Sequence, residues 1–139
     1  MQNVLVTGGA GFIGSNLIKK LIDKGFDVTS LDNYSTGNIE NHVDGAKYLN
    51  DDIESISEIE TQFDTCFHLA AQSRVQPSFD NPEESFRVNV NGTSKVMEWS
   101  KENDVKVIYA GSSSKHHNPS DSPYAMYKFL GEEICKLYR

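Results

Sequence analysis

The chain has 139 residues, about the length of one domain, and a formal net charge of −7. This acidic balance argues against nucleic acids and anionic membranes as partners, because phosphate binding needs basic patches. No apolar run approaches the ~20 residues of a membrane-spanning helix, and the N-terminus shows no secretory signal. Two cysteines are too few for a disulfide framework. We therefore expect a single cytoplasmic domain.

The N-terminal segment predicts a strand, a glycine-rich turn and a helix. The apolar run 4–6 is typical of a strand buried on both faces. Glycines follow at positions 8, 9, 11 and 14, and apolar residues from Phe12 to Ile22 then recur at intervals of three and four. Glycines in this context allow a tight turn and the close approach of a pyrophosphate, which the helix N-terminus can bind. The segment predicts a dinucleotide site, with a plain glycine turn as the alternative.

The second strand, expected at 27–31, is followed by a carboxylate. Asp32 lies about 20 residues beyond the glycines, where dinucleotide-binding folds place the acid that binds the adenosine ribose hydroxyls. A carboxylate at this position repels a 2′-phosphate, and no Arg or Lys occurs between Asn33 and Glu40. The pattern favours NAD over NADP. A turn-forming role at the strand end is the alternative for Asp32.

Strands and helices alternate along the rest of the chain. We expect strands at 47–49, 64–71 and 106–110, and helices at 55–63, 82–103 and 124–139. Short apolar strands joined by long crossovers indicate an α/β fold whose parallel sheet is covered on both faces. We expect a doubly wound, Rossmann-like sheet with strand order 3-2-1-4-5 and a binding site at the carboxyl ends of its strands.

Two residues of the last predicted helix have the spacing of a catalytic pair. Tyr124 and Lys128 are four residues apart, so they share one helix face. An ammonium one turn away stabilises a phenolate, which allows a tyrosine to act as a general base. Serines 112–114 end the fifth strand at the same edge, and one hydroxyl could bind the substrate oxygen that loses its proton. An amphipathic face is the alternative, but the NAD-binding pattern favours catalysis.

Seven motifs occur along the chain in a characteristic order. They are T-G-G-A-G-F-I-G, L-D-N, D-D-I, H-L-A-A-Q, N-V-N-G-T, S-S-S and P-Y-A-M-Y-K. As a set they resemble those of the extended short-chain dehydrogenase/reductases, in the branch of NAD-dependent nucleotide-sugar epimerases and dehydratases. The resemblance covers nearly the whole chain. It implies NAD as cofactor, a nucleotide sugar as substrate, and a homodimer formed through helices 82–103 and 124–139.

The resemblance also assigns roles to individual residues. It implies Tyr124 as the catalytic base, Lys128 at the nicotinamide ribose and Ser114 at the sugar hydroxyl, with Ser113 as the alternative to Ser114. The cofactor-binding residues that it implies are Gly8, Gly11, Phe12, Ile13, Gly14, Asp32, Asn33, Asp52, Ile53, Leu69, Ala70, Ala71, Asn89, Tyr124 and Lys128. We expect no metal site, because His116 and His117 match no standard ligand spacing.

The chain departs from the family pattern in three respects. Family members are about twice as long, so the resemblance implies that residues 1–139 form the NAD-binding domain alone, without the C-terminal substrate domain. Only nine residues separate Ser114 from Tyr124, where the family usually has a longer loop that closes over the substrate. Lys115 stands where dehydratases usually carry an acid, which favours an epimerase. The alternatives to an epimerase are a half-length dinucleotide-binding protein with little catalysis of its own, and a dehydratase or reductase of the same family.

Overall fold

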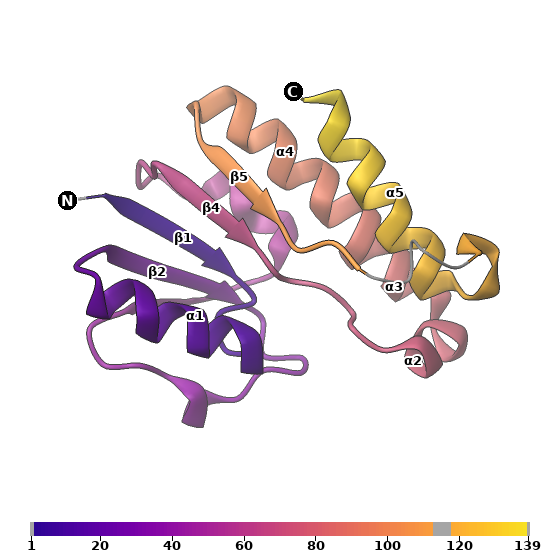
Figure 1. The fold of residues 1–139 in the computed structure, drawn as a ribbon, viewed down its shortest axis with the longest axis horizontal. Coiled ribbons are helices and arrows are strands. Elements are labelled where there is room, and N and C mark those ends of the chain that lie inside the picture. Colours follow the sequence, from indigo (N-terminus) through magenta and orange to yellow (C-terminus); the bar gives the residue numbers. More distant parts are fainter. Residues whose placement is uncertain (1, 113–117, 139) are drawn as a thin grey trace.

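The computed structural model describes residues 2–112 and 118–138 of the chain. These residues form a parallel sheet with strand order β3-β2-β1-β4-β5, which confirms the predicted Rossmann-like topology (Figure 1). In the register of the sheet, Val6 of the central strand pairs with Ser30 on one side and Phe67 on the other. The strands are β1 (Asn3–Thr7), β2 (Asp27–Asp32), β3 (Lys47–Asn50), β4 (Thr65–His68) and β5 (Lys106–Tyr109).

Helices cover both faces of the sheet. Helix α1 (Phe12–Asp23) packs on one face, and α4 (Gly92–Asn103) with the 3₁₀ helix η2 (Ile53–Glu58) packs on the other (Figure 1). Because successive strand residues point to opposite faces, Val4 and Val6 belong to the core under α1, whereas Leu5 belongs to the core under α4. All three side chains are 2% exposed or less, as expected for a central strand.

Helix α5 (Pro123–Leu137) lies beside α4, and its Lys128 contacts the Tyr109 ring of β5 (Figure 1). Its first turn is set by Ser122, whose Oγ accepts a hydrogen bond from the Ala125 amide at 3.0 Å, and by Pro123 at the first helical position. Other short elements include α2 (Val75–Asp80) and the 3₁₀ helices η1 (Ile39–Asn41) and η5 (Pro119–Asp121). No helix among residues 2–112 and 118–138 is long and apolar enough to span a membrane.

The long helix expected at 82–103 is present but interrupted. It consists of α3 (Pro82–Phe86), one π-helical turn labelled η3 (Arg87–Asn91), and α4. A π-helical turn takes up one extra residue and shifts the side chains after it around the helix axis, and such turns are frequent at functional sites. Apolar spacing before and after the turn remains helical, so the sequence pattern gave no sign of it.

Two element predictions were wrong. The helix expected at 55–63 is instead η2, which begins earlier because Asp52 Oδ1 accepts a hydrogen bond from the Glu54 amide at 3.0 Å. The apolar spacing in this segment reflects burial of Ile56 and Phe63 in one core cluster, not a continuous helix. The strand expected at 64–71 ends at His68, so residues 69–71 form a loop at the carboxyl edge of the sheet.

Candidate functional site

The glycine turn after β1 brings the backbone into the candidate site. Gly8 has a φ of 77°, which residues with a side chain rarely adopt. A Cβ atom on Gly14 would meet the Gly8 carbonyl oxygen, so a glycine at 14 lets α1 start directly against the turn. A Cβ atom on Gly11 would have a single neighbour at 3.4 Å, an ordinary contact. Gly11 therefore is not required for packing, and its bare backbone faces the space in front of α1.

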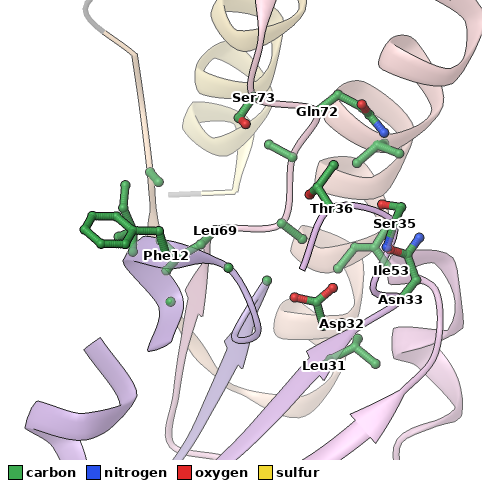
Figure 2. A pocket seen from close by; sticks show the side chains of 18 of the residues that line it. Phe12, Leu31, Asp32, Asn33, Ser35, Thr36, Ile53, Leu69, Gln72 and Ser73 are labelled. Atoms are coloured by element: carbon green, nitrogen blue, oxygen red, sulfur yellow. The ribbon is translucent and has the colours of Figure 1, made fainter. Parts of the chain in front are cut away.

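That space is a cavity of about 380 Å³ at the carboxyl ends of the strands, a size typical of ligand pockets (Figure 2). It is lined by all the cofactor-binding residues predicted from the sequence except Asp52 and Asn89. Its other lining residues, which sequence reasoning missed, are mostly chain neighbours of the predicted ones: Leu31, Ser35, Thr36, Asp51, Gln72, Ser73, Val88, Ala110 and Gly111.

Asp32 is fixed at the floor of the cavity. Its Oδ2 accepts a hydrogen bond from the Ala10 amide at 2.9 Å, and its Oδ1 accepts one from the Tyr34 amide at 2.9 Å. Figure 2 shows the carboxylate directed into the cavity. Each carboxylate oxygen has a further lone pair, so Asp32 can still accept hydrogen bonds from a ligand.

The loop after β2 closes onto the glycine turn. The Ala10 carbonyl oxygen accepts hydrogen bonds from the Asn38 amide at 3.1 Å and from Asn41 Nδ2 at 2.8 Å. Gly37 lies so close that a Cβ atom there would be 2.9 Å from Ala10 Cβ and 3.1 Å from Asp32 Oδ2. The loop that supplies Asn33, Ser35 and Thr36 to the cavity is therefore attached to the turn it faces.

Asp52 lies beside the cavity, not on its wall. Its Oδ1 and Oδ2 accept hydrogen bonds from Arg87 Nη1 at 2.8 Å and Nη2 at 3.0 Å. These bonds are the main reason that the pKa of Asp52 is lowered to about 2. Its neighbours Asp51 and Ile53 do line the cavity. No sequence signal pointed to Arg87, which is 35 residues away in the chain.

Asn89 acts on the site through the backbone of another loop. It is buried at 1% exposure. Its Oδ1 accepts a hydrogen bond from the Gln72 amide at 2.8 Å, and its Nδ2 donates to the Gln72 carbonyl at 3.1 Å. This pair of bonds holds the loop after β4, whose residues from Leu69 to Ser73 line the cavity.

A buried threonine–histidine–threonine chain supports the same loop. Thr7 Oγ1 accepts hydrogen bonds from the Leu69 amide at 3.0 Å and the Ala70 amide at 3.1 Å, which occupy its lone pairs. Its proton therefore goes to His68 Nδ1 at 2.7 Å, and His68 Nε2 donates to Thr93 Oγ1 at 3.0 Å. Burial, with a smaller contribution from Lys128, lowers the pKa of His68 to about 3. The imidazole is thus neutral, and its role is structural.

Tyr124 and Lys128 line the same cavity as the glycine turn. The Tyr124 amide donates to Ser78 Oγ at 3.0 Å, which ties α5 to α2. Lys128 is only 7% exposed, and its Nζ donates to the Ala110 carbonyl oxygen at 2.8 Å. Burial lowers the pKa of Lys128 to about 8. The fold therefore brings the predicted catalytic pair to the same cavity as Asp32 and the glycines.

The predicted serine lies outside the part of the chain that the structure describes. This applies to Ser114 and to its alternative Ser113, as well as to His116 and His117. Ser112 is described and directly follows Gly111, which lines the cavity. Among residues 2–112 and 118–138, no three His, Cys, Asp or Glu side chains are grouped so that they could hold a metal ion.

Comparisons with known proteins find relatives that share this fold. The putative UDP-glucose 4-epimerase of Methanocaldococcus jannaschii is 37% identical over 97% of this chain and 50% of its own length. The structure of a UDP-glucose 4-epimerase from Thermotoga maritima with UDP-glucose matches 98% of this chain and 50% of that protein, with a TM-score of 0.91 and 30% identity. The UDP-glucose 4-epimerase from Brucella ovis in complex with NAD matches 99% of this chain and 48% of that protein, with a TM-score of 0.90 and 29% identity.

The chain thus spans about half the length of the relatives that it matches. A model of the NAD dependent epimerase/dehydratase family covers residues 4–139. The motifs, the sheet topology and the cavity all lie within this match. The chain therefore belongs to the NAD dependent epimerase/dehydratase family, whose cofactor is NAD.

Proposed function

We propose that this chain holds NAD in the cavity and forms the cofactor-binding part of a nucleotide-sugar epimerase. The observation that carries the proposal is the meeting, in one cavity, of the glycine turn, Asp32, and the pair Tyr124 and Lys128. The NAD complex of the Brucella ovis relative and the UDP-glucose complex of the Thermotoga maritima relative support the choice of cofactor and substrate class.

Different residues of the cavity suit different parts of the cofactor. The amide groups at the start of α1, with Gly11 as the residue before the helix, suit the pyrophosphate. The Asp32 carboxylate suits the adenosine ribose hydroxyls, and Lys128 suits the nicotinamide ribose at the other end. NAD, when bound, supplies a hydride acceptor at the sugar carbon. Tyr124 then accepts the proton of the sugar hydroxyl, and the Lys128 ammonium stabilises the resulting phenolate.

The serine that contacts the sugar hydroxyl belongs to the segment after β5. Ser114, with Ser113 as the alternative, is the proposed residue from the sequence. Ser112 is a further candidate because it directly follows a cavity-lining residue, Gly111. Single alanine substitutions at the three positions distinguish them: the functional serine is the one whose loss lowers epimerase turnover without changing NAD affinity.

A homodimer in the cytoplasm is part of the same proposal. The two helical segments proposed as its interface, 82–103 and 124–139, pack side by side through α4 and α5. Leu137 on α5 is 81% exposed and Phe86 on α3 is 40% exposed, so both segments carry apolar surface that a partner chain can cover. Light scattering at micromolar concentrations is expected to give the mass of two chains; the mass of one chain would contradict the dimer.

Calorimetric titration with NAD and NADP tests the central proposal. We expect NAD to bind more tightly, because the Asp32 carboxylate repels a 2′-phosphate. Asp32→Ala should weaken NAD binding and reduce the difference between the affinities for NAD and NADP. Asp23→Ala, at the far end of α1, makes the same charge change outside the cavity and should alter neither affinity. Equal or tighter binding of NADP by the unaltered chain would refute the assignment of the site.

A further inference from the structure

A chain of polar contacts runs along one side of the cavity and joins three segments that are distant in sequence. Asn33, after β2, donates from Nδ2 to Asp52 Oδ2 at 3.2 Å. Arg87, in the π-helical turn, donates to both oxygens of Asp52 at 2.8 and 3.0 Å. The same guanidinium donates from Nε and Nη2 to the two oxygens of Glu84 at 2.8 and 2.7 Å. Arg87 thus makes two bidentate contacts at once.

The charges of this cluster are fixed over the physiological range. Hydrogen bonds from Arg87 are the largest cause that lowers the pKa of Asp52 to about 2 and also lowers the pKa of Glu84. Hydrogen bonds to Glu84 and Asp52 raise the pKa of Arg87. The side chains of Arg87, Asp52 and Glu84 remain 32%, 30% and 37% exposed. Ion pairs exposed to that extent contribute little to stability, so the main consequence of this cluster is geometric.

In each of the three joined segments, the residue that makes the polar contact either lines the cavity or is next in the chain to a residue that does. Asn33 lines the cavity itself, Asp52 lies between the lining residues Asp51 and Ile53, and Arg87 is followed by the lining residue Val88. These wall residues lie on the side of Asp32 where the proposed site takes the adenosine half of the dinucleotide. Figure 2 shows Asn33 and Ile53 together on one side of the Asp32 carboxylate, with Phe12 on the other.

The corner formed by Asp51, Asp52 and Ile53 is also attached to the sheet, because the Asp51 amide donates a hydrogen bond to the Asp32 carbonyl oxygen at 3.1 Å and Ile53 is buried in the core under α4. The Asp51 carboxylate accepts from the Asp52 amide at 2.8 Å, and Asp52 Oδ1 accepts from the Glu54 amide at 3.0 Å; both bonds are local to the corner. On the apolar side, Ile53 packs close to Gly92, where an added Cβ would be 2.8 Å from Ile53 Cγ2. Arg87 therefore supplies the strong polar attachment of this corner to the helical layer.

We propose that Arg87 is a positioning residue for the adenine end of the dinucleotide, which it serves by holding the Asp51–Ile53 corner through Asp52. Arg87 does not line the cavity; it reaches the corner through its bidentate contact with Asp52 and through a longer, 3.7 Å ion pair with Glu54, the residue that follows Ile53. The polar groups of the corner then read the edge of the adenine ring, including its 6-amino group. This inference rests on the proposed NAD site and adds to it the residue that sets the shape of the adenine wall.

A competing explanation is simple attraction between the positive charge of Arg87 and the anionic dinucleotide. The two explanations differ for Arg87→Lys. A lysine keeps the charge but presents a point ammonium, which cannot make bidentate contacts with Asp52 and Glu84 together. If Arg87 acts by positioning, Arg87→Lys should lose nearly as much NAD affinity as Arg87→Gln. If it acts by simple attraction, Arg87→Lys should keep the NAD affinity of the unaltered chain.

The experiment is calorimetric titration of the unaltered chain and its variants with NAD and with nicotinamide hypoxanthine dinucleotide, which lacks the adenine 6-amino group. We expect the unaltered chain to prefer NAD. Arg87→Lys and Arg87→Gln should each weaken NAD binding roughly tenfold and weaken the hypoxanthine analogue less, so that the preference narrows. Lys136→Gln is the matched control, because it removes one positive charge and the 2.8 Å ion pair with Glu133 on the outer part of α5; it should change neither affinity.

The outcomes separate this inference from the proposed function. If the unaltered chain binds neither dinucleotide, the NAD site itself is wrong and the inference fails with it. If it binds NAD but Arg87→Lys keeps the full affinity and preference, the NAD site stands and the positioning role is wrong. An unaltered chain that binds both dinucleotides equally also overturns the inference. Thermal melting checks that each variant is folded. If Arg87→Gln is not folded, the dinucleotide affinities of Arg87→Lys alone decide whether Arg87 has a positioning role.

Discussion

The Nζ atom of Lys128 lies 4.5 Å from the centroid of the Tyr109 ring and donates a 2.8 Å hydrogen bond to the Ala110 carbonyl oxygen. The ring face and the carbonyl both attract the ammonium, so they fix it at the carboxyl end of β5. Burial nevertheless lowers the pKa of Lys128 to about 8. The lysine is therefore held in position by contacts that only partly offset the cost of burying its charge.

Lys128→Met should separate stability from function. The pKa of Lys128 falls from an ordinary value of 10.5 to about 8 on folding, so between these values the unfolded chain binds more protons and stability rises with pH. Methionine does not titrate, so the variant loses this dependence of stability on pH. We expect its free energy of unfolding to be roughly 1–3 kcal/mol higher at pH 7 and its NAD binding to be weaker. Urea denaturation between pH 7.5 and 9.5 measures the slope. An equal slope in both proteins would contradict the burial of a charged Lys128.

His68→Asn should make the free energy of unfolding depend less on pH below pH 6.5. The pKa of His68 falls from 6.5 to about 3 on folding. Stability from the neutral imidazole is therefore complete above pH 6.5 and is lost as the pH falls toward 3, at about 1.4 kcal/mol per unit at most. Asparagine keeps an acceptor for the Thr7 hydroxyl but does not titrate.

Urea denaturation between pH 4 and 6.5 checks this prediction. The variant should be less stable at pH 7, because the hydrogen bond to Thr93 is lost. Its stability should also change less with pH than that of the unaltered chain. Parallel profiles for the two proteins would mean that His68 is not the group responsible for the acid loss.

Gly11→Ala and Gly14→Ala form a matched pair. An alanine at 14 would place its Cβ against the Gly8 carbonyl oxygen and 2.8 Å from Gly9 Cα, so we expect a stability loss of about 3 kcal/mol or more. An alanine at 11 meets its nearest atom at 3.4 Å, and it should cost no more than about 1 kcal/mol as a poorer helix cap. Gly11→Ala should nevertheless weaken NAD binding at least tenfold, because its methyl group occupies the approach of the pyrophosphate.

Thermal melting and titration of both variants decide between packing and ligand approach. A stable Gly14→Ala variant would show that α1 can move away from the turn at little cost. Unchanged NAD affinity in Gly11→Ala would show that the pyrophosphate does not pass close to this backbone.

The 139-residue chain by itself should bind NAD but turn over UDP-sugars poorly. Tyr124 and Lys128 can contribute proton transfer, worth about 10²- to 10⁴-fold. Positioning of the sugar against the nicotinamide is worth more, up to ~7–11 kcal/mol, and depends on contacts with the nucleotide end of the substrate. The chain spans about half the length of the matched epimerases, and we expect those contacts to come largely from the other half. Product analysis on a panel of nucleotide sugars tests this; turnover near 1 s⁻¹ that is lost in Tyr124→Phe would contradict it.

The sequence alone determined the sheet, the glycine turn and Asp32, whereas most of the other predicted lining residues were implied by the family resemblance. Short apolar strands, glycines at fixed spacing and one acid after β2 are local patterns, and local backbone sterics and hydrophobic periodicity suffice to interpret them. The alternation of strands and helices indicated a parallel sheet, and the strand order followed from the doubly wound fold that this alternation matches. Because the carboxyl ends of parallel strands share one edge, the glycine turn and Asp32 could be expected at a common site without coordinates, whereas Tyr124, in α5, was assigned to the site by its spacing to Lys128 and by the family resemblance.

Only the tertiary structure decided how the walls of the cavity are held. The π-helical turn at 87–91 leaves the helical apolar pattern intact, so it has no local signature. Asp52 and Arg87 are 35 residues apart, and His68 reaches Thr7 across 61 positions. Such polar pairs depend on the relative placement of whole elements, which the packing of the two core layers fixes. Local sequence patterns specify elements and motifs, whereas the partner of a buried or bidentate polar group is set by the packing of elements that are far apart in the chain.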